Sequence, residues 1–171
     1  ITIDDVEVGT TATGAMLMDV EQIELLRGPQ GTQFGANALA GIISIRTPAP
    51  SDTFSGSIET GYGNYDSWHV GASVSGPLSA AIHGRLALQQ NKSDGYYTNT
   101  FQNRDDTNER DELSVRGKLR WTGEDGAEVN LIASYADLDG GYDAFSLDNT
   151  RTTLSDNPGH DRQETVALAL K

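Results

Sequence analysis

An alternation of apolar and polar residues runs from residue 53 towards the end of the chain. It is clearest in segments 54–62, 68–74, 82–89, 113–121 and 129–135, and a sixth run begins at 165. In 82–89, for example, Leu86 and Leu88 oppose Arg85 and Gln89. Since successive side chains of a strand point to opposite faces, the pattern predicts strands with one apolar and one polar face. Ile132 is the exception, because it places an apolar residue on the polar face.

The lengths of these runs and their connections favour a membrane barrel. Each run spans about 9–11 residues, the length of a tilted strand that crosses a bilayer core. Tight turns at 76–80 and 123–127 alternate with long polar loops at 92–111 and 138–162, as in outer-membrane barrels. A soluble antiparallel sheet has the same alternation. The two expected aromatic girdles favour the membrane, with Phe54 and Trp121 at one rim and Tyr62, Trp68 and Tyr135 at the other.

Composition excludes several classes of protein. The net charge of −13 opposes a nucleic-acid partner. The absence of cysteine rules out disulfides, thiolate metal sites and a cysteine nucleophile. No apolar run approaches the ~18 residues of a membrane helix, although alternating barrel strands contain no such run either.

Residues 1–52 follow a different pattern and are predicted to be a separate domain from 53–171. Residues 1–8 alternate like a strand, and a short helical turn is expected at Asp19, followed by a strand through Leu25 and Leu26. A third strand is predicted at 41–47, and the segment 48–52, PAPSD, ends the unit. Because both termini interrupt alternating runs, we expect the chain to be a piece of a longer protein.

The glycine-rich stretch RGPQGTQFG, residues 27–35, is not a phosphate-binding loop. That motif needs a lysine followed by serine or threonine after its last glycine, and both are missing here. The stretch is instead interpreted as a turn, in which Pro29 fixes the backbone and the glycines permit positive φ or close backbone approach.

No catalytic constellation is present, so neither an enzyme nor a cofactor is predicted. The three histidines form no H-E-x-x-H motif, and GASVSG at 71–76 lacks the last glycine of a nucleophile elbow. Two acidic clusters could offer oxygen ligands to calcium, namely Asp137, Asp139 and Asp143, and Asp105, Asp106 and Glu109. Neither matches the twelve-residue calcium loop, so solvated acidic loops are predicted and no metal site is assigned.

The segment DVEQIELLRGPQGTQFGANALAGIISIRTPAP, residues 19–50, resembles the C-terminal part of the plug domain of TonB-dependent outer-membrane receptors. The later segments GYGNYD, SGPLS, DGYYTN and LSVRGKLRW resemble the first barrel strands of that family. The resemblance implies a mainly β fold in the cell outer membrane. In it, a transmembrane antiparallel barrel of about 22 strands is closed by a small α+β plug. This chain would supply the C-terminal part of the plug, residues 1–52, and about six barrel strands, residues 53–171.

The resemblance also implies a function, which is energy-coupled import of a scarce solute. A ferric siderophore is the leading expectation, with cobalamin or a glycan as alternatives. The implied partners are the solute, outer-membrane lipid and the inner-membrane TonB complex, which would act through a segment that this chain lacks. A passive barrel channel and a soluble β-sandwich binding module or adhesin remain as rivals, although a porin has no separate plug of this kind.

The resemblance assigns two groups of plug residues. Arg27 matches an arginine that sits between plug and barrel wall and faces barrel glutamates, so we predict that it locks the plug in the intact protein and lacks its partner here. A solvated loop arginine is the alternative. The plug turn motif comprises Gly28, Pro29, Gly31, Gly35, Asn37 and Gly41.

A cluster of cations is predicted on the polar face of the third and fourth barrel strands. It consists of Arg85, Arg116, Lys118 and Arg120. The cluster has two interpretations. It either pairs with plug carboxylates such as Glu21 or Glu24, or it lines the solute path and attracts an anion such as a ferric chelate.

Overall fold

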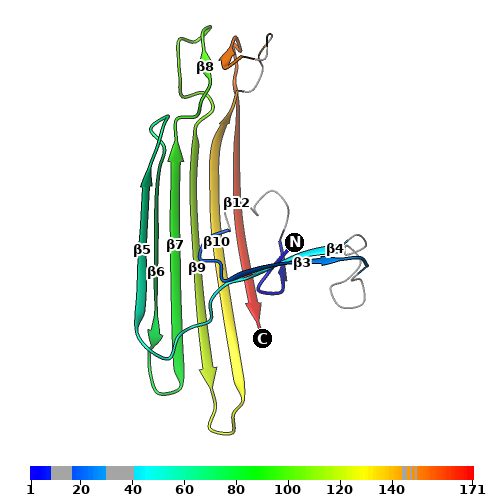
Figure 1. The fold of residues 1–171 in the computed structure, drawn as a ribbon, viewed down its shortest axis with the longest axis vertical. Coiled ribbons are helices and arrows are strands. Elements are labelled where there is room, and N and C mark those ends of the chain that lie inside the picture. Colours follow the sequence, from blue (N-terminus) through cyan, green and yellow to red (C-terminus); the bar gives the residue numbers. More distant parts are fainter. Residues whose placement is uncertain (9–16, 30–40, 144–145, 147, 149) are drawn as a thin grey trace.

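The computed structural model describes residues 1–8, 17–29, 41–143, 146, 148 and 150–171. Within these residues the secondary structure consists of strands alone, arranged in a six-stranded, a four-stranded and a two-stranded sheet (Figure 1). None of the residues described forms a helix long and apolar enough to span a membrane.

The six-stranded sheet, called the strand wall below, confirms the six alternating runs. Its strands are antiparallel neighbours in the order β12-β10-β9-β7-β6-β5. Their bounds are β5 Ser55–Tyr62, β6 Trp68–Pro77, β7 Ile82–Ser93, β9 Arg110–Thr122, β10 Glu128–Tyr142 and β12 Gly159–Leu170.

Two of these strands are longer than the sequence indicated. β10 and β12 pair continuously from Leu131–Leu170 to Tyr142–Gly159, so the loop predicted over 138–162 is wrong at both of its ends. Of its acidic residues, Asp139 and Asp161 are strand residues. Asp139 lies 2.8 Å from His160, and the preceding Asp137 lies 2.8 Å from Arg162. Polar cross-strand contacts thus stabilise a strand in a segment that composition alone assigns to a loop.

The connections divide between the two ends of the wall, as predicted (Figure 1). Short turns join β6 to β7 and β9 to β10 at one end. At the other end, β8 (Thr98–Asn99) and β11 (Thr152–Thr153) pair in parallel and join the two long connections. Tyr62 and Trp68 pair across β5 and β6 at this loop end. The rim position expected for Tyr135 is wrong, because β10 continues past it to Tyr142.

The N-terminal sheet has the order β2-β1-β4-β3, with β1 at Thr2–Ile3, β2 at Val6–Glu7, β3 at Gln22–Arg27 and β4 at Gly41–Arg46. The single strand expected over 1–8 is instead a hairpin, because Asp4 and Asp5 have φ of 47° and 62° and turn the chain. The helical turn expected at Asp19 is also wrong. Asp19 has φ of 51°, and the chain enters β3 at Gln22, where it pairs with β4.

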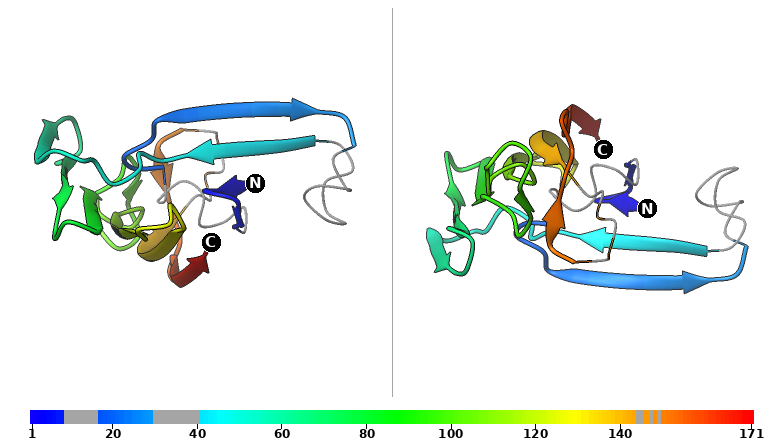
Figure 2. Two further views of the ribbon diagram at one scale, coloured as in Figure 1. Left: turned by 90° about the horizontal axis from the view of Figure 1, so that it is seen from below. Right: turned by 90° about the horizontal axis from the view of Figure 1, so that it is seen from above.

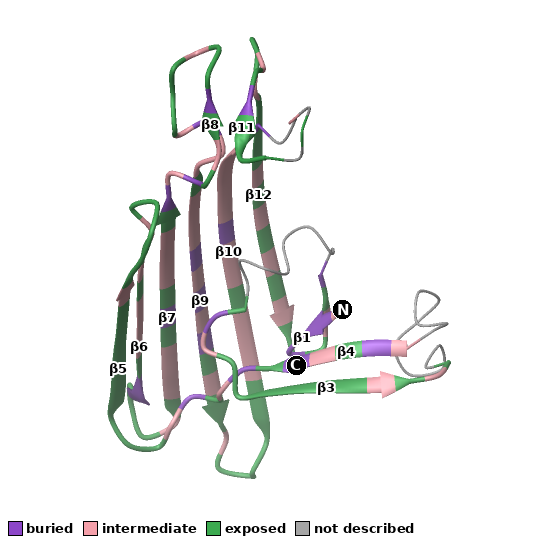
Figure 3. Cartoon of the chain, turned by 45° about the horizontal axis from the view of Figure 1, so that its top comes forward, coloured by how far each residue is buried: buried purple, intermediate pink, exposed green. Residues whose placement is uncertain are grey.

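The N-terminal sheet packs on the polar face of the strand wall (Figures 2 and 3). Ile3, Val8 and Ile45 form a buried cluster with Ala136 of β10. Ile132, the exception to the alternation, lines a small cavity beside Ile3 and Val8, so its apolar side chain serves this contact. From there β3 and β4 extend away from the wall (Figure 2).

The opposite face of the wall is apolar and uncovered. Ile58 is 80% exposed, Val166 75% and Leu168 71%. Within the described residues, the outer edges of β5 and β12 have no neighbouring strand. The described residues thus form a sheet with an exposed apolar face and two open edges, as part of a barrel would have.

Candidate functional site

The four predicted cations lie together on the polar face of the wall. Arg85 of β7 is directly opposite Lys118 of β9, and Arg116 and Arg120 occupy the same face of β9 on either side of Lys118. Like charges placed opposite each other destabilise a sheet. The cluster therefore needs counter-charges, and residues 4–52 supply them.

Arg85 forms a two-pronged ion pair with Asp19. Its Nε donates to Asp19 Oδ2 at 2.7 Å and its Nη2 donates to Oδ1 at 2.5 Å. Both side chains are largely buried, with exposures of 13% and 17%. Ser73 Oγ accepts a further hydrogen bond from Nη2 at 3.3 Å. This planar arrangement fixes the segment before β3 against the wall.

Lys118 connects the wall to two parts of the N-terminal sheet. Its Nζ lies 2.9 Å from Asp4 Oδ2 and donates to the Thr47 carbonyl at 2.9 Å. Asp4 also accepts hydrogen bonds from Thr47 N and Oγ1. Burial by itself would raise the pKa of Asp4, but the hydrogen bonds from Thr47 and Lys118 outweigh it and lower the pKa below its ordinary value. Asp4 is therefore a buried carboxylate that stays ionised.

The other two cations differ in their surroundings. Arg116 is only 2% exposed, and its Nη1 donates to the Met18 carbonyl at 3.0 Å. Arg120 Nη2 lies 2.5 Å from Asp52 Oδ1, at the exposed beginning of the strand wall. Asp19, Asp4 with Thr47, and the Met18 carbonyl thus hold three of the four cations. Arg120 instead pairs with Asp52, in the connection between β4 and β5.

The carboxylates that meet the cluster are not those expected. Asp4, Asp19 and Asp52 take the place of Glu21 and Glu24, and Glu24 accepts from the neighbouring Gln22 instead. Asp4 and Asp19 both have positive φ, a conformation that aspartate tolerates better than most residues. Sequence analysis missed both aspartates as partners of the cluster, because residues in turns carry no periodic signal and only their tendency to form turns could have indicated them.

The glycine-rich motif lies at the far end of the N-terminal sheet. Arg27, the last residue of β3, is exposed, and no ion pair to it exists among the residues described. Its predicted role as a lock remains a prediction.

The glycines of the turn motif are described only in part. Gly28 has φ of 89° and Gly41 of 145°, and a Cβ on Gly41 would lie 2.5 Å from the Leu26 carbonyl oxygen. Pro29 is exposed. Gly31, Gly35 and Asn37 lie outside the described residues.

A second polar centre surrounds Asp143 at the loop end of the wall. The sequence predicted this residue only as a member of an acidic cluster. Asp143 is 1% exposed, and its Oδ2 accepts from Asn99, Thr107 and Thr153 at 2.8, 2.8 and 2.7 Å. Burial alone would raise the pKa of Asp143, but these three hydrogen bonds lower it below its ordinary value. Asp143 thereby ties the two long connections together. In the described part of the chain, no group of three or more acidic, histidine or cysteine side chains could hold a metal ion.

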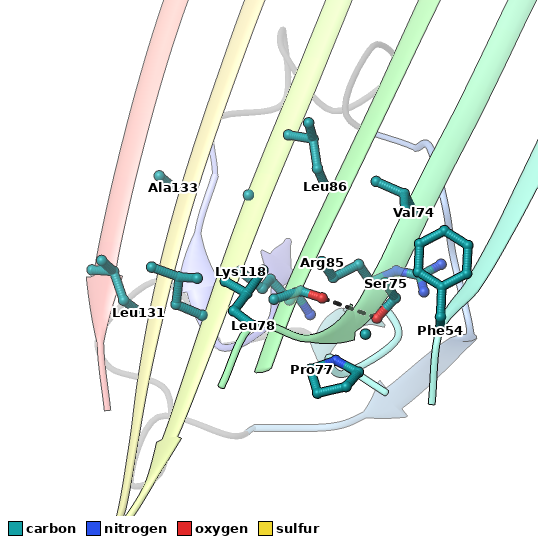
Figure 4. A pocket seen from close by; sticks show the side chains of 14 residues that line it. Phe54, Val74, Ser75, Pro77, Leu78, Arg85, Leu86, Lys118, Leu131 and Ala133 are labelled. Atoms are coloured by element: carbon teal, nitrogen blue, oxygen red, sulfur yellow. Dashed lines mark hydrogen bonds between the residues drawn. The ribbon is translucent and has the colours of Figure 1, made fainter. Parts of the chain in front are cut away.

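An apolar groove of about 470 Å³ lies on the uncovered face of the wall (Figure 4). Phe54, Val74, Leu86 and Leu131 stand around it, and the small residues Gly84 and Gly117 leave the space open. Arg85 and Lys118 also border it, but their charged ends contact Asp19 and Asp4 on the other face of the wall. The groove therefore belongs to the apolar face and not to the ion-pair cluster.

Comparison with known proteins supplies relatives for most of the chain, although no protein-family model matches it. It is 39% identical to the pesticin receptor of Yersinia pestis over 105 residues, covering 61% of this chain. It is 30% identical to the vitamin B12 transporter BtuB of Vibrio vulnificus over 126 residues, covering 70% of this chain. The crystal structure of the ferric yersiniabactin uptake receptor FyuA from Yersinia pestis superposes on 99% of this chain, with a TM-score of 0.86 and 30% identity.

The matched proteins are much longer than this chain. It spans 16% of the pesticin receptor, 21% of BtuB and 28% of the FyuA structure. The relatives are receptors and transporters by name, and the FyuA superposition includes both the N-terminal sheet and the strand wall.

Proposed function

This chain belongs to the TonB-dependent receptors of the outer membrane, and we propose that the receptor containing it imports a ferric siderophore. Import would draw energy from the inner-membrane TonB complex. The family membership supports this function in general terms, and the structural contacts described above support a plugged rather than an open barrel.

We propose the same division of the chain that the sequence indicated. Residues 1–52 are the C-terminal part of the plug, and residues 53–171 are the first barrel strands. Two separate sheets support this boundary, because one ends at Arg46 and the other begins at Ser55. Ser51 N donates to Ser75 Oγ at 2.8 Å and anchors the connection between them to the wall.

The main support for the proposal is that protein covers the polar face of the wall and not the apolar face. The N-terminal sheet covers the polar face with buried ion pairs, and the apolar face is left uncovered. A soluble β-sandwich buries its apolar faces against each other, the reverse of this arrangement. A passive channel needs an open polar lumen, whereas here residues 1–52 occupy the polar face around Arg85, Arg116 and Lys118. A plug inside a barrel in lipid accounts for both faces.

The relatives support a ferric siderophore as the solute and cobalamin as a second candidate. FyuA is a ferric yersiniabactin uptake receptor, and BtuB is a vitamin B12 transporter. The cation cluster on the polar face favours the iron chelate, because such chelates are commonly anionic.

Uptake by living cells tests this proposal. Cells without other siderophore receptors would produce the complete receptor and would be given radiolabelled ferric yersiniabactin or radiolabelled cobalamin, with and without a protonophore. We expect iron to accumulate only in energised cells. Iron uptake that is insensitive to the protonophore would indicate a passive channel, and uptake of cobalamin alone would replace the siderophore by the second candidate.

A further inference from the structure

The apolar groove of Figure 4 adjoins a second groove on the uncovered face of the wall. The first groove crosses β6, β7, β9 and β10, and a Cβ on Gly117 in its floor would meet no atom within 4 Å. The second groove, of about 530 Å³, crosses β5, β6 and β7. Val74 and Leu86 pair across β6 and β7 and line both grooves, so they lie between the two. The apolar face thus carries two neighbouring channels.

Both channels continue the surface that faces lipid in an outer-membrane barrel. Ile58, Val74 and Leu86 of their linings are 80%, 42% and 46% exposed. The N-terminal sheet packs on the other face, so no described segment of this chain covers them (Figure 3). Acyl chains gain free energy with every methylene that they bury, and a lipid with two chains matches two adjoining channels.

The first groove reaches the end of the wall where the short turns lie. Pro77, the last residue of β6, and Leu78, which follows it, line this groove, and Leu78 lies over Gly84 of β7. The short turns of an outer-membrane barrel are periplasmic. A lipid whose chains fill the channels from this end therefore belongs to the inner leaflet, and its head group lies beside the turns at 78–81 and 123–127.

The charges of these turns favour a head group that contains a cation. Residues 78–81 carry no charge, whereas 123–127 contain Glu124 and Asp125, and Glu128 follows at the start of β10. An ammonium group is attracted to these carboxylates, and a head group with a net negative charge is repelled.

The basic residues next to the first groove are already paired. Arg85 and Lys118 border it, but each pairs with an aspartate on the polar face of the wall. Arg120 pairs with Asp52. Among the described residues, therefore, no unpaired lysine or arginine beside the groove can hold an anionic head group.

We propose that the two grooves bind the acyl chains of one ethanolamine phospholipid of the inner leaflet, with its ammonium group facing the acidic turn at 123–127. The bound lipid then fills the space above Gly117 and separates the wall from the moving lipids around it. Lipid binding requires only the outer-membrane location of the family, so it does not depend on the solute that the receptor imports.

Lipid retention by the complete receptor tests this proposal. The delipidated receptor would be placed in bilayer discs with equal amounts of phosphatidylethanolamine and phosphatidylglycerol of identical chains. Native mass spectrometry would then count the lipids that stay bound when the disc is removed. Gly117→Leu fills the first groove from its floor. The matched control, Thr60→Leu, adds a leucine to the same face of β5 outside both linings. Thermal unfolding would show that both variants are folded.

We expect the wild type to retain one phospholipid, and to retain phosphatidylethanolamine about threefold more often than phosphatidylglycerol, as an exposed charge pair allows. Gly117→Leu should lower retention about tenfold, because the lipid loses the burial of about two methylenes. Thr60→Leu should match the wild type. Equal retention by Gly117→Leu and Thr60→Leu would reduce the grooves to ordinary lipid-covered surface and overturn the proposal.

A charge reversal tests the head group separately. Glu124→Lys should abolish the preference for phosphatidylethanolamine, whereas Asp156→Lys, at an exposed position near the loop end, should keep it. A preference that survives Glu124→Lys would contradict the assignment of the ammonium group to the acidic turn.

A measurement on the wild type decides the matter if Gly117→Leu fails to fold. Phosphatidylethanolamine with a photoreactive diazirine in one acyl chain would be crosslinked to the receptor in the same discs. We expect peptides that contain 117–119 and 131–133 to be labelled more strongly than the peptide that contains Val166 and Leu168, which are exposed and apolar but line neither groove. Equal labelling would overturn the proposal, and a failure of iron uptake would leave either result unaffected.

Discussion

Lys118 shows how single residues hold the plug to the wall. The alternation placed this lysine on the polar face, but its partner Asp4 lies far away in the sequence, in a turn that the sequence pattern assigned to a strand. Sequence could therefore predict one half of the ion pair and not the other. The same holds for Arg85 and Asp19. Strand periodicity identifies residues of the wall, whereas the plug residues that meet them are set by tertiary packing.

Replacing Lys118 by glutamine should loosen the plug strongly. The change leaves Asp4 as a buried carboxylate without its cation, and removing one member of a buried pair costs about 3–5 kcal/mol. Adding Asp4→Asn should recover part of the loss, because neither buried group is then charged. Hydrogen exchange of amides in residues 1–8 of the complete receptor would measure the opening. Arg162→Gln, at an exposed pair, should cost less than about 1 kcal/mol. Equal effects of the two changes would contradict this account.

Asp143 should make the junction of the two long connections sensitive to acid. Its pKa is lowered in the folded protein, so the stabilisation is complete above the unfolded value of about 3.9 and is lost as the pH falls through the folded value. At pH values above about 3.9, where the wild-type junction is fully stabilised, Asp143→Asn should already weaken it. The reason is that an amide replaces the ionised acceptor of three hydrogen bonds. Limited proteolysis of the loops between pH 2 and pH 7 would detect both effects. The comparison variant is Asp106→Asn, at an exposed pair with Arg104. A wild-type junction that stays protected at the lowest pH would contradict the expectation.

At the scale of elements, the strands were predicted by periodicity and their ends were not. All six runs of the wall are present, but β10 and β12 continue through Asp139, Gly140 and His160, which composition assigns to a loop. The side-chain contacts Asp137–Arg162 and Asp139–His160, together with close backbone contacts, stabilise this extension. Gly141 donates its N–H to the Glu109 carbonyl at 2.9 Å, and there is no room for a side chain beside it. Such contacts between distant segments leave no local pattern in the sequence.

Gly141→Ala should consequently destabilise the loop end of the wall. The added Cβ would lie 2.4 Å from the Thr107 carbonyl oxygen, so the connection between β7 and β9 must shift at a cost of about 1–3 kcal/mol. Gly117→Ala is the matched control, because a Cβ there meets no atom within 4 Å and points into the apolar groove. Thermal unfolding of the complete receptor in detergent would rank the two variants. A larger loss for Gly117→Ala would show that the close contact at Gly141 is wrong.

At the scale of the whole molecule, the two faces of the wall have opposite environments. Lipid would cover the apolar face, and the plug covers the polar face around Arg85, Arg116 and Lys118, whereas the polar face of β5 is exposed. Alternation alone predicted the two faces but not which of them is covered by protein. That distinction came from the N-terminal sheet, whose position depends on the ion pairs at Arg85 and Lys118.

Ion conductance across a planar lipid bilayer tests the plugged barrel most directly. The complete wild-type receptor would be inserted and a voltage applied in potassium chloride, without TonB. Because the N-terminal sheet covers the polar face and is held there by buried ion pairs, we predict no steady conductance above that of the bare bilayer. A stable open conductance in the wild type would contradict the account and would identify the protein as a passive channel.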